Sequence, residues 1–161
     1  MRKDLLKATV LFGLLLTLAM ALPAQAQDRT LDRIKKLGTL IIGYRETARP
    51  FSFKNDQGQP DGYSVDLCRR IATAVEKSLG LSRLNVRFVP VTAETRVEAV
   101  AKGTVDIECG STTMSLSRQE QVDFTHMTFV DGGSLLVVDG LGIRTVPDLR
   151  GKRVAVIPST T

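Results

Sequence analysis

The sequence predicts an α/β protein with a mainly parallel sheet that helices cover on both faces. Residues 39–44, 84–88 and 105–109 are short apolar or alternating runs, which are typical of strands. Residues 64–79 and 92–102 instead repeat their apolar side chains at the spacing of helices. The resulting order of strand, helix, strand, helix and strand favours parallel strands joined by helical connections.

The first elements form a strand and a helix joined by a long loop. Residues 32–37 have the pattern of a short amphipathic helix, and the apolar run 39–44 follows as a buried strand. The loop is rich in proline and glycine, and Phe51 and Phe53 alternate within it like a short strand. Cys68, Ile71, Ala72, Val75 and Leu79 give the helix at 64–79 its apolar face.

The following elements repeat the pattern. The second strand ends at Pro90, and Thr92 is expected to cap a helix that Gly103 ends. A third strand follows at 105–109, and residues 117–120 match the capping box of a further short helix.

The last part of the chain is expected to begin a second sheet. Residues 134–138 and 153–157 read as apolar strands, with a helical turn and a connection at 146–152 between them. One strand and a turn cannot bury a core. We therefore expect one lobe and the start of another.

The N-terminus has the three parts of a secretory signal peptide. A basic end precedes an apolar run at 8–22, and Ala24 and Ala26 form an A-x-A cleavage site. The run is shorter than the roughly 20 residues of a membrane span, which disfavours an uncleaved anchor. We expect cleavage after Ala26 and export to the periplasm, which would lower the net charge from +5 to +3.

This composition argues against several classes of function. No basic stripe with interleaved aromatic residues is present, so nucleic-acid binding is not expected. No C-x-x-C motif or histidine cluster suggests a metal site, and no cofactor is expected. Cys68 and Cys109 would enter an oxidising compartment, where pairing is possible, but two buried free thiols fit the apolar patterns equally well.

The candidate chemistry lies where the predicted strands end, because ligands of such sheets bind beyond the carboxyl ends of the strands. Arg45, Arg96 and Arg118 follow the three strands, and the hydroxyls of residues 111–113 lie beside them. A guanidinium matches a carboxylate with two parallel hydrogen bonds. Each arginine alone could be a surface ion pair, but together they predict a carboxylate site.

The order of several motifs then carries a resemblance to a known family. From residue 37 to 161 the chain resembles the family 3 extracellular solute-binding proteins, and among them the glutamate/aspartate-binding branch. The supporting segments are residues 38–46, 50–53, 62–67, 103–113 and 148–152, of which 103–113 is the most specific.

The resemblance implies a type II periplasmic binding fold, in which two lobes, each a mainly parallel sheet flanked by helices, close around an amino acid. The expected organisation is a signal peptide at 1–26, lobe 1 at 27–132, a hinge strand at 133–138 and the start of lobe 2 at 139–161.

The resemblance also implies roles for individual residues. Arg118 matches the arginine that binds the ligand α-carboxylate, and Ser111 and Thr113, with Thr112 between them, match residues that contact its backbone groups. Arg45 and Arg96 are expected to bind the side-chain carboxylate.

Three further positions belong to the expected site. Thr160 and Thr161 match a ligand-contacting motif of the second lobe, and Phe51 is a candidate for packing on the ligand, although core packing is the favoured interpretation. Ala93 departs from the hydroxyl residue of the branch, which leaves glutamate versus aspartate open. No residue in this set binds the ligand ammonium.

The expected protein is a monomer that delivers an acidic amino acid to the permease of an ABC importer. The alternative is a cyclohexadienyl (arogenate) dehydratase-like enzyme on the same scaffold, and a weaker one is the sensor lobe of a receptor. An enzyme needs a placed general acid or base. We expect no catalytic residue, because His126 fits a surface or interlobe position and Asp106 and Glu108 fit hydrogen-bonded structural acids.

Overall fold

The computed structural model describes residues 30–160, so the predicted signal peptide and Thr161 lie outside the described residues. The chain divides into two units, Met1–Lys36 and Leu37–Thr161. Helix α2, Thr30–Leu37, falls almost wholly in the first unit and confirms the predicted helix before Gly38. Within the described part of the chain, no helix has the length and apolarity that a membrane span requires.

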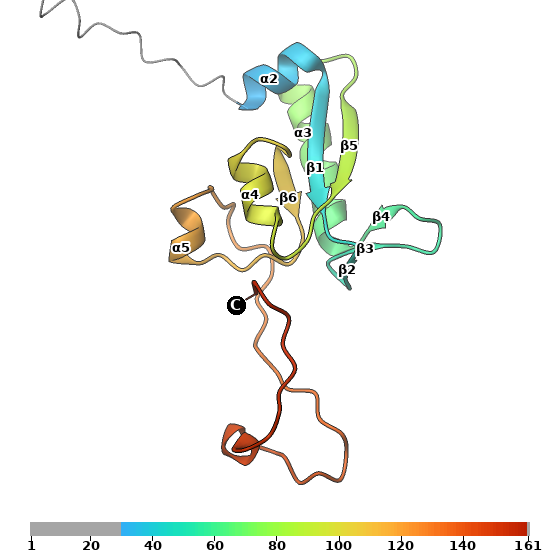
Figure 1. The fold of residues 1–161 in the computed structure, drawn as a ribbon. Helices are drawn as coiled ribbons and strands as arrows, with labels where there is room; N and C mark the ends of the chain where they lie inside the picture. The colour runs from blue at the N-terminus through green and yellow to red at the C-terminus, as the bar shows by residue number, and fades with distance from the viewer. Residues whose placement is uncertain (1–29, 161) are drawn as a thin grey trace, which may run out of the picture. The chain divides into compact units, whose positions relative to one another are not determined.

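The second unit is built on a parallel sheet of three strands in the order β5-β1-β6 (Figure 1). The strands are β1 at Thr39–Tyr44, β5 at Asn85–Pro90 and β6 at Ile107–Cys109. Ile42 of β1 pairs with Phe88 on one side and with Ile107 on the other. The predicted α/β class, with its strand-helix alternation, is therefore confirmed.

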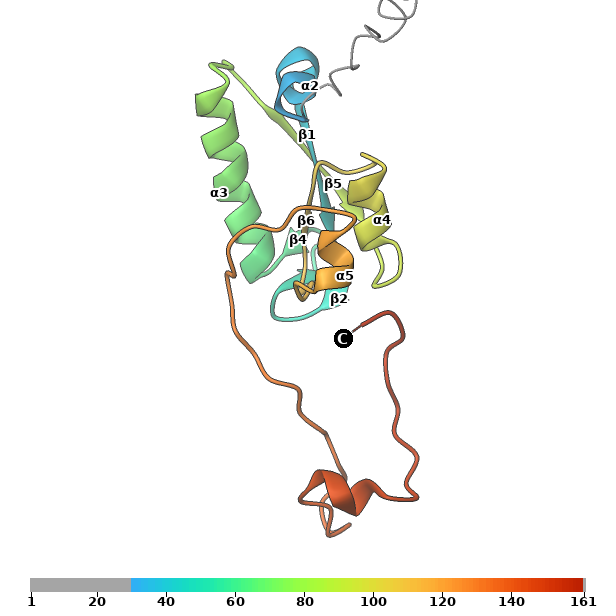
Figure 2. The same cartoon turned by 90° about the vertical axis from the view of Figure 1, so that its left-hand side faces the viewer.

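Two helices cover opposite faces of this sheet, as Figure 2 shows. They are α3 at Tyr63–Ser78 and α4 at Arg96–Ala101, and both contact β6. Apolar side chains buried between these layers form the core, because their removal from water outweighs the cost of ordering them. Among them are Leu40, Ile42, Val65, Cys68, Ala72 and Val105.

A small antiparallel sheet occupies the loop between β1 and α3. Its strands are β2 at Thr47–Ala48, β3 at Ser52–Lys54 and β4 at Pro60–Asp61. The short strand expected around Phe51 and Phe53 is thus present, with Phe51 one residue before it.

Helix α3 begins against this loop, and the loop supplies its N-terminal hydrogen bonds. The backbone N–H groups of Tyr63 and Ser64 donate to the carbonyls of Pro50 and Phe51 at 3.1 and 2.8 Å. Gly62 precedes the helix with φ +116°, and a Cβ there would lie 2.6 Å from the Phe51 carbonyl oxygen. Only glycine combines that backbone angle with so close an approach.

A disulfide between Cys68 and Cys109 fastens α3 to the end of β6, with the two Cα atoms 6.4 Å apart. The sequence left this pairing open, and the structure contains the bond. Beside it, the Ser64 hydroxyl donates to the Gly110 carbonyl at 2.7 Å. Two side chains of one helix therefore hold the segment that follows β6.

Two predicted helix caps are wrong. Helix α5, Leu116–Gln119, begins after Ser115, so Ser117 lies inside the helix, and no side chain caps it. The hydroxyls of Ser115 and Ser117 lie 3.2 Å apart and interact with each other instead. Helix α4 begins at Arg96 rather than after Thr92, whose hydroxyl accepts the N–H of Thr95 in the preceding turn.

Two predicted strands are also not formed. Residues 134–138 and 153–157 have no strand conformation, and only the 3-10 helix η1, Val146–Leu149, confirms the predicted turn between them. A strand needs a neighbour for its N–H and C=O groups, and no described segment pairs with either run. Their apolar side chains, Leu136 and Val156 among them, are exposed. The lobe and hinge boundaries stay predictions.

Replacing Cys68 and Cys109 together by alanine should lower the free energy of unfolding by about 4 kcal/mol, because the bond closes a long loop in the unfolded chain. Urea unfolding of the complete gene product that contains this chain would measure it. Wild type under a reducing agent should converge on the variant, and an unchanged midpoint in both would contradict the stabilising role.

Candidate functional site

The structure brings the three predicted arginines to one edge of the sheet. Arg45 directly follows β1, Arg96 opens α4 after β5, and Arg118 lies in α5 after β6. The pKa of Arg96 is lowered by burial first, which Glu108 opposes, and then by the charges of Arg118 and Arg45. The ends of the three parallel strands place these residues at one edge of the sheet, and we call the three residues the arginine cluster.

Ser52 fixes the backbone at the first of these positions. Its fully buried hydroxyl accepts the N–H of Arg45 at 2.9 Å and donates to the carbonyl oxygen of the same residue at 3.2 Å. The contact links β3 to the end of β1. The side chain of Arg45 forms no ion pair with another described residue, so its guanidinium is available at the sheet edge.

Arg96 is the most enclosed member of the cluster. It is 3 % exposed, and its Nε atom is buried without a hydrogen-bond partner among the described residues. A guanidinium keeps its charge in proteins because its ordinary pKa lies far above neutral pH. A buried charge is costly unless it is paired, so this position favours an anionic partner.

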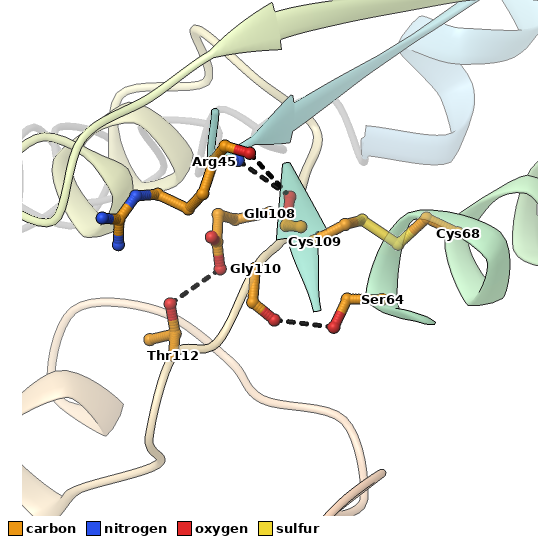
Figure 3. The surroundings of a disulfide bond; sticks show 8 residues. Arg45, Ser64, Cys68, Glu108, Cys109, Gly110 and Thr112 are labelled. Carbon is orange, nitrogen blue, oxygen red and sulfur yellow. Dashed lines mark hydrogen bonds between the residues drawn. A yellow bond between two sulfur atoms is a disulfide. The ribbon is translucent and has the colours of Figure 1, made fainter. Parts of the chain in front are cut away.

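Glu108 supplies one negative charge beside the cluster. Its Oε2 atom accepts the hydroxyl of Thr112 at 2.8 Å, whereas its Oε1 atom is buried without a described partner (Figure 3). Burial raises the pKa of Glu108, and this outweighs the opposite effects of the Thr112 hydrogen bond and of Arg96 and Arg45.

Sequence reasoning treated Glu108 only as a structural acid and missed its place among the arginines. For Asp106 the predicted role of a hydrogen-bonded structural acid is confirmed, because its Oδ2 accepts the N–H of Ile41 at 2.7 Å. The signal that could have identified Glu108 is its position in the third strand, one residue from its end, where the neighbouring strand is followed by Arg45.

Gly110 lies between the side chains of Arg45 and Glu108. A Cβ at this glycine would lie 3.0 Å from Cγ of Arg45 and would overlap the Glu108 carboxylate. The absence of a side chain therefore lets both charged groups approach the segment that follows β6.

The hydroxyl segment 111–113 is held by Arg118. The Nη1 atom of Arg118 donates to the Thr113 carbonyl at 2.8 Å, and Nη2 lies 3.4 Å from the Ser159 carbonyl. The contact with Thr113 binds α5 to the loop that precedes it. Ser111 and Thr113 are exposed, as a ligand-contacting role requires.

Two cavities adjoin this edge of the sheet. The first, of about 210 Å³, is lined by Arg96, Glu108 and Thr112. The second, of about 320 Å³, is lined by Phe51 and residues 111–113. Arg45 and Arg118 line neither of these two, so the structure does not enclose all predicted site residues in one cavity.

The remaining predicted positions differ in their surroundings. Phe51 packs edge-to-face on Tyr63 and Phe129, with ring centroids 6.2 and 4.9 Å away, in agreement with the packing role that the sequence left open. His126 is exposed at the second cavity. The hydroxyl of Thr160 donates to the Ile157 carbonyl at 2.8 Å. Residues 30–160 contain no group of acidic, histidine or cysteine side chains that could hold a metal ion.

Replacing Ser52 by alanine should leave the N–H of Arg45 without its acceptor in a buried position, which costs about 1–3 kcal/mol of stability. Urea unfolding of the complete gene product would measure the loss. Ser78→Ala, an exposed serine on α3, is the matched control and should change stability by less than about 0.5 kcal/mol. Equal midpoints for the two variants would contradict the role given to Ser52.

The chain is similar to two curated relatives along most of its length. It is 45% identical over 133 residues to an L-glutamate/L-aspartate-binding protein of Pseudomonas aeruginosa, covering 82% of this chain and 44% of the relative. It is 43% identical over 138 residues to a glutamate/aspartate import solute-binding protein of Salmonella typhimurium, covering 86% of this chain and 46% of that relative. The chain thus spans about half the length of the curated relatives it matches.

A solved structure and a family model agree with these relatives. The structure is that of an ancestral amino acid-binding protein described as a precursor of cyclohexadienyl dehydratase, with TM-score 0.50 and 39% identity over 60% of this chain and 40% of that chain. Residues 40–150 match the model of the bacterial extracellular solute-binding proteins, family 3. With two thirds of its residues covered by that match, the chain belongs to family 3 of the bacterial extracellular solute-binding proteins.

Proposed function

We propose that the gene product containing this chain captures an acidic amino acid, glutamate or aspartate, in the periplasm and delivers it to the permease of an ABC importer. The observation that carries the proposal is the arginine cluster, in which three guanidinium groups lie at one edge of the sheet beside the buried carboxylate of Glu108. The named function of the two curated relatives supports the same ligand class.

The charge of the cluster fits a dicarboxylic amino acid. Three arginines with Glu108 carry an excess of positive charge, and Arg96 holds its charge with little access to water. A ligand carboxylate offers the bidentate acceptor that a guanidinium binds best. A ligand with two carboxylates therefore satisfies more of this site than glutamine does.

The proposed contacts assign each group of the ligand to residues at the ends of the strands. Arg118 binds the α-carboxylate together with the hydroxyls of Ser111 and Thr113, and Arg45 and Arg96 bind the side-chain carboxylate. Thr112 acts by holding Glu108, with which it is hydrogen-bonded. Thr160 and Thr161 are proposed to contact the ligand from the second lobe, and Phe51 borders the ligand through the aromatic group it shares with Tyr63 and Phe129.

The proposal extends to the organisation of the gene product. The signal peptide, residues 1–26, is cleaved after Ala26. Lobe 1 covers residues 27–132, the hinge strand covers residues 133–138, and lobe 2 begins at residue 139. The mature protein is a monomer, and closing of the two lobes around the ligand presents a distinct shape to the permease.

A dehydratase-like enzyme is the second candidate. One observation favours it: Glu108 is a carboxyl with a raised pKa beside the site, and such groups serve as general acids or bases. We propose binding without catalysis, because the two curated relatives are named as binding proteins.

Isothermal titration of the complete gene product with glutamate, aspartate, glutamine, histidine and arogenate tests the ligand class. Glutamate or aspartate should bind at least tenfold more tightly than the other three, because glutamine and histidine present only one carboxylate and the second carboxylate of arogenate is attached to a bulky ring. Preference for arogenate with turnover would replace the importer function with the enzyme.

Arg118→Ala should abolish binding of every amino acid, whereas Arg45→Ala should weaken glutamate about 10- to 100-fold and glutamine far less, since a charged hydrogen bond contributes about 1.5–3 kcal/mol. The same titrations measure both losses. Arg70→Ala, an exposed arginine on α3, is the matched control and should bind like wild type. Equal losses of glutamate and glutamine in Arg45→Ala would refute the role in charge selection.

A further inference from the structure

Glu108 is a half-buried carboxylate that the proposed contacts with the ligand do not use. It projects from β6, one residue before the disulfide-bonded Cys109, and its carboxylate lies beside Gly110. One of its oxygens accepts the hydroxyl of Thr112, and the other is buried beside Gly110. A proton on the second oxygen would leave the contact to Thr112 in place.

The groups around Glu108 define its charge balance. Arg45 approaches it from the end of β1, Arg96 from α4, and the N–H of Gly110 from the following loop, and all three favour the ionised form. Arg118, on α5, lowers the pKa of Arg96 through its positive charge. Burial opposes these effects and is the largest contribution to the raised pKa of Glu108.

The other elements around the first cavity add little positive charge. Helix α3 lines it only with Ser64, Leu67, Cys68 and Ile71, which carry no charge there. The remaining charged residues at this cavity are Asp106, which accepts the N–H of Ile41, and Asp123, which is exposed. Besides the hydrogen bond from Thr112, the ionised form of Glu108 is therefore favoured by the positive charges of Arg96 and Arg45, the same two groups that are proposed to take the ligand side chain.

A ligand carboxylate on these arginines would change that balance. It adds a negative charge near Glu108, and a like charge disfavours ionisation of a neighbouring carboxyl group. We propose that Glu108 takes up a proton when an acidic amino acid binds to the arginine cluster, so that Glu108 makes the binding of acidic ligands depend on pH. This inference rests on the proposed function and names a regulatory residue of the same site.

The direction in which pH changes the affinity follows from the coupling between ligand binding and proton uptake by Glu108. Without ligand, the pKa of Glu108 is already above its ordinary value, and the ligand raises it further. Between these two pKa values the free protein is ionised and the complex is protonated, so falling pH tightens binding there, by at most tenfold per pH unit for one proton. Above the window, binding is weaker and independent of pH.

Titrations of the complete gene product with L-glutamate between pH 5 and 8.5, in two buffers of different ionisation enthalpy, count the protons taken up. We expect wild type to take up as much as one proton per ligand within the window. Glu108→Gln mimics the protonated carboxyl, so it should take up none and should bind at pH 8.5 at least as tightly as wild type. Asp123→Asn is the matched control and should keep the uptake.

A second variant tests the same residue without changing its charge. Thr112→Val removes a hydrogen bond that favours the ionised form of Glu108, so it should move the window of proton uptake to higher pH. This shift can be measured even if Glu108→Gln fails to fold.

The outcomes separate this inference from the proposed function. Binding of glutamate with no proton exchange at any pH, uptake that persists in Glu108→Gln, or an unmoved window in Thr112→Val would overturn the inference alone. Failure of both glutamate and aspartate to bind would overturn the proposed function and this inference with it.

Discussion

The common direction of β1, β5 and β6 is the constraint on which the candidate site depends. Parallel strands end at the same edge of a sheet, so the segments after them meet, and Arg45, Arg96 and Arg118 meet with them. Like charges gathered in this way repel one another, and the side chains alone would not stay together. The packed core between α3 and α4 offsets that repulsion, because the strand ends cannot separate without opening the sheet.

The backbone of the site is held by contacts that do not involve the guanidinium groups of Arg45 and Arg96. Ser52 binds the main chain of Arg45, while Ser64 and the Cys68–Cys109 disulfide bind the end of β6. These contacts are short-range and do not weaken with salt in the way that exposed ion pairs do. The backbone positions of the arginine cluster therefore depend little on whether an anion neutralises the charges of its side chains.

Much of this arrangement could be predicted from the sequence, because the spacing of apolar residues and the order of strands and helices can be read directly along the chain. The runs at 39–44 and 105–109 marked strands, and the alternation with helices gave the parallel sheet and the place of the arginines. The role of Glu108 could not be predicted, since it arises from burial between segments far apart in the chain. The prediction of strands at 134–138 and 153–157 was wrong for a related reason: an apolar run forms a strand only when a neighbouring strand pairs with its backbone.

The contact between Ser52 and residue 45 has a consequence for how this scaffold changes over time. Both atoms that Ser52 contacts at that residue, the amide nitrogen and the carbonyl oxygen, are common to almost every amino acid. The scaffold therefore fixes the position of residue 45 but not its identity. A single codon change there can replace a cation by a neutral or an acidic group without loss of either backbone contact, so a lineage can exchange the charge of its ligand while it keeps its fold.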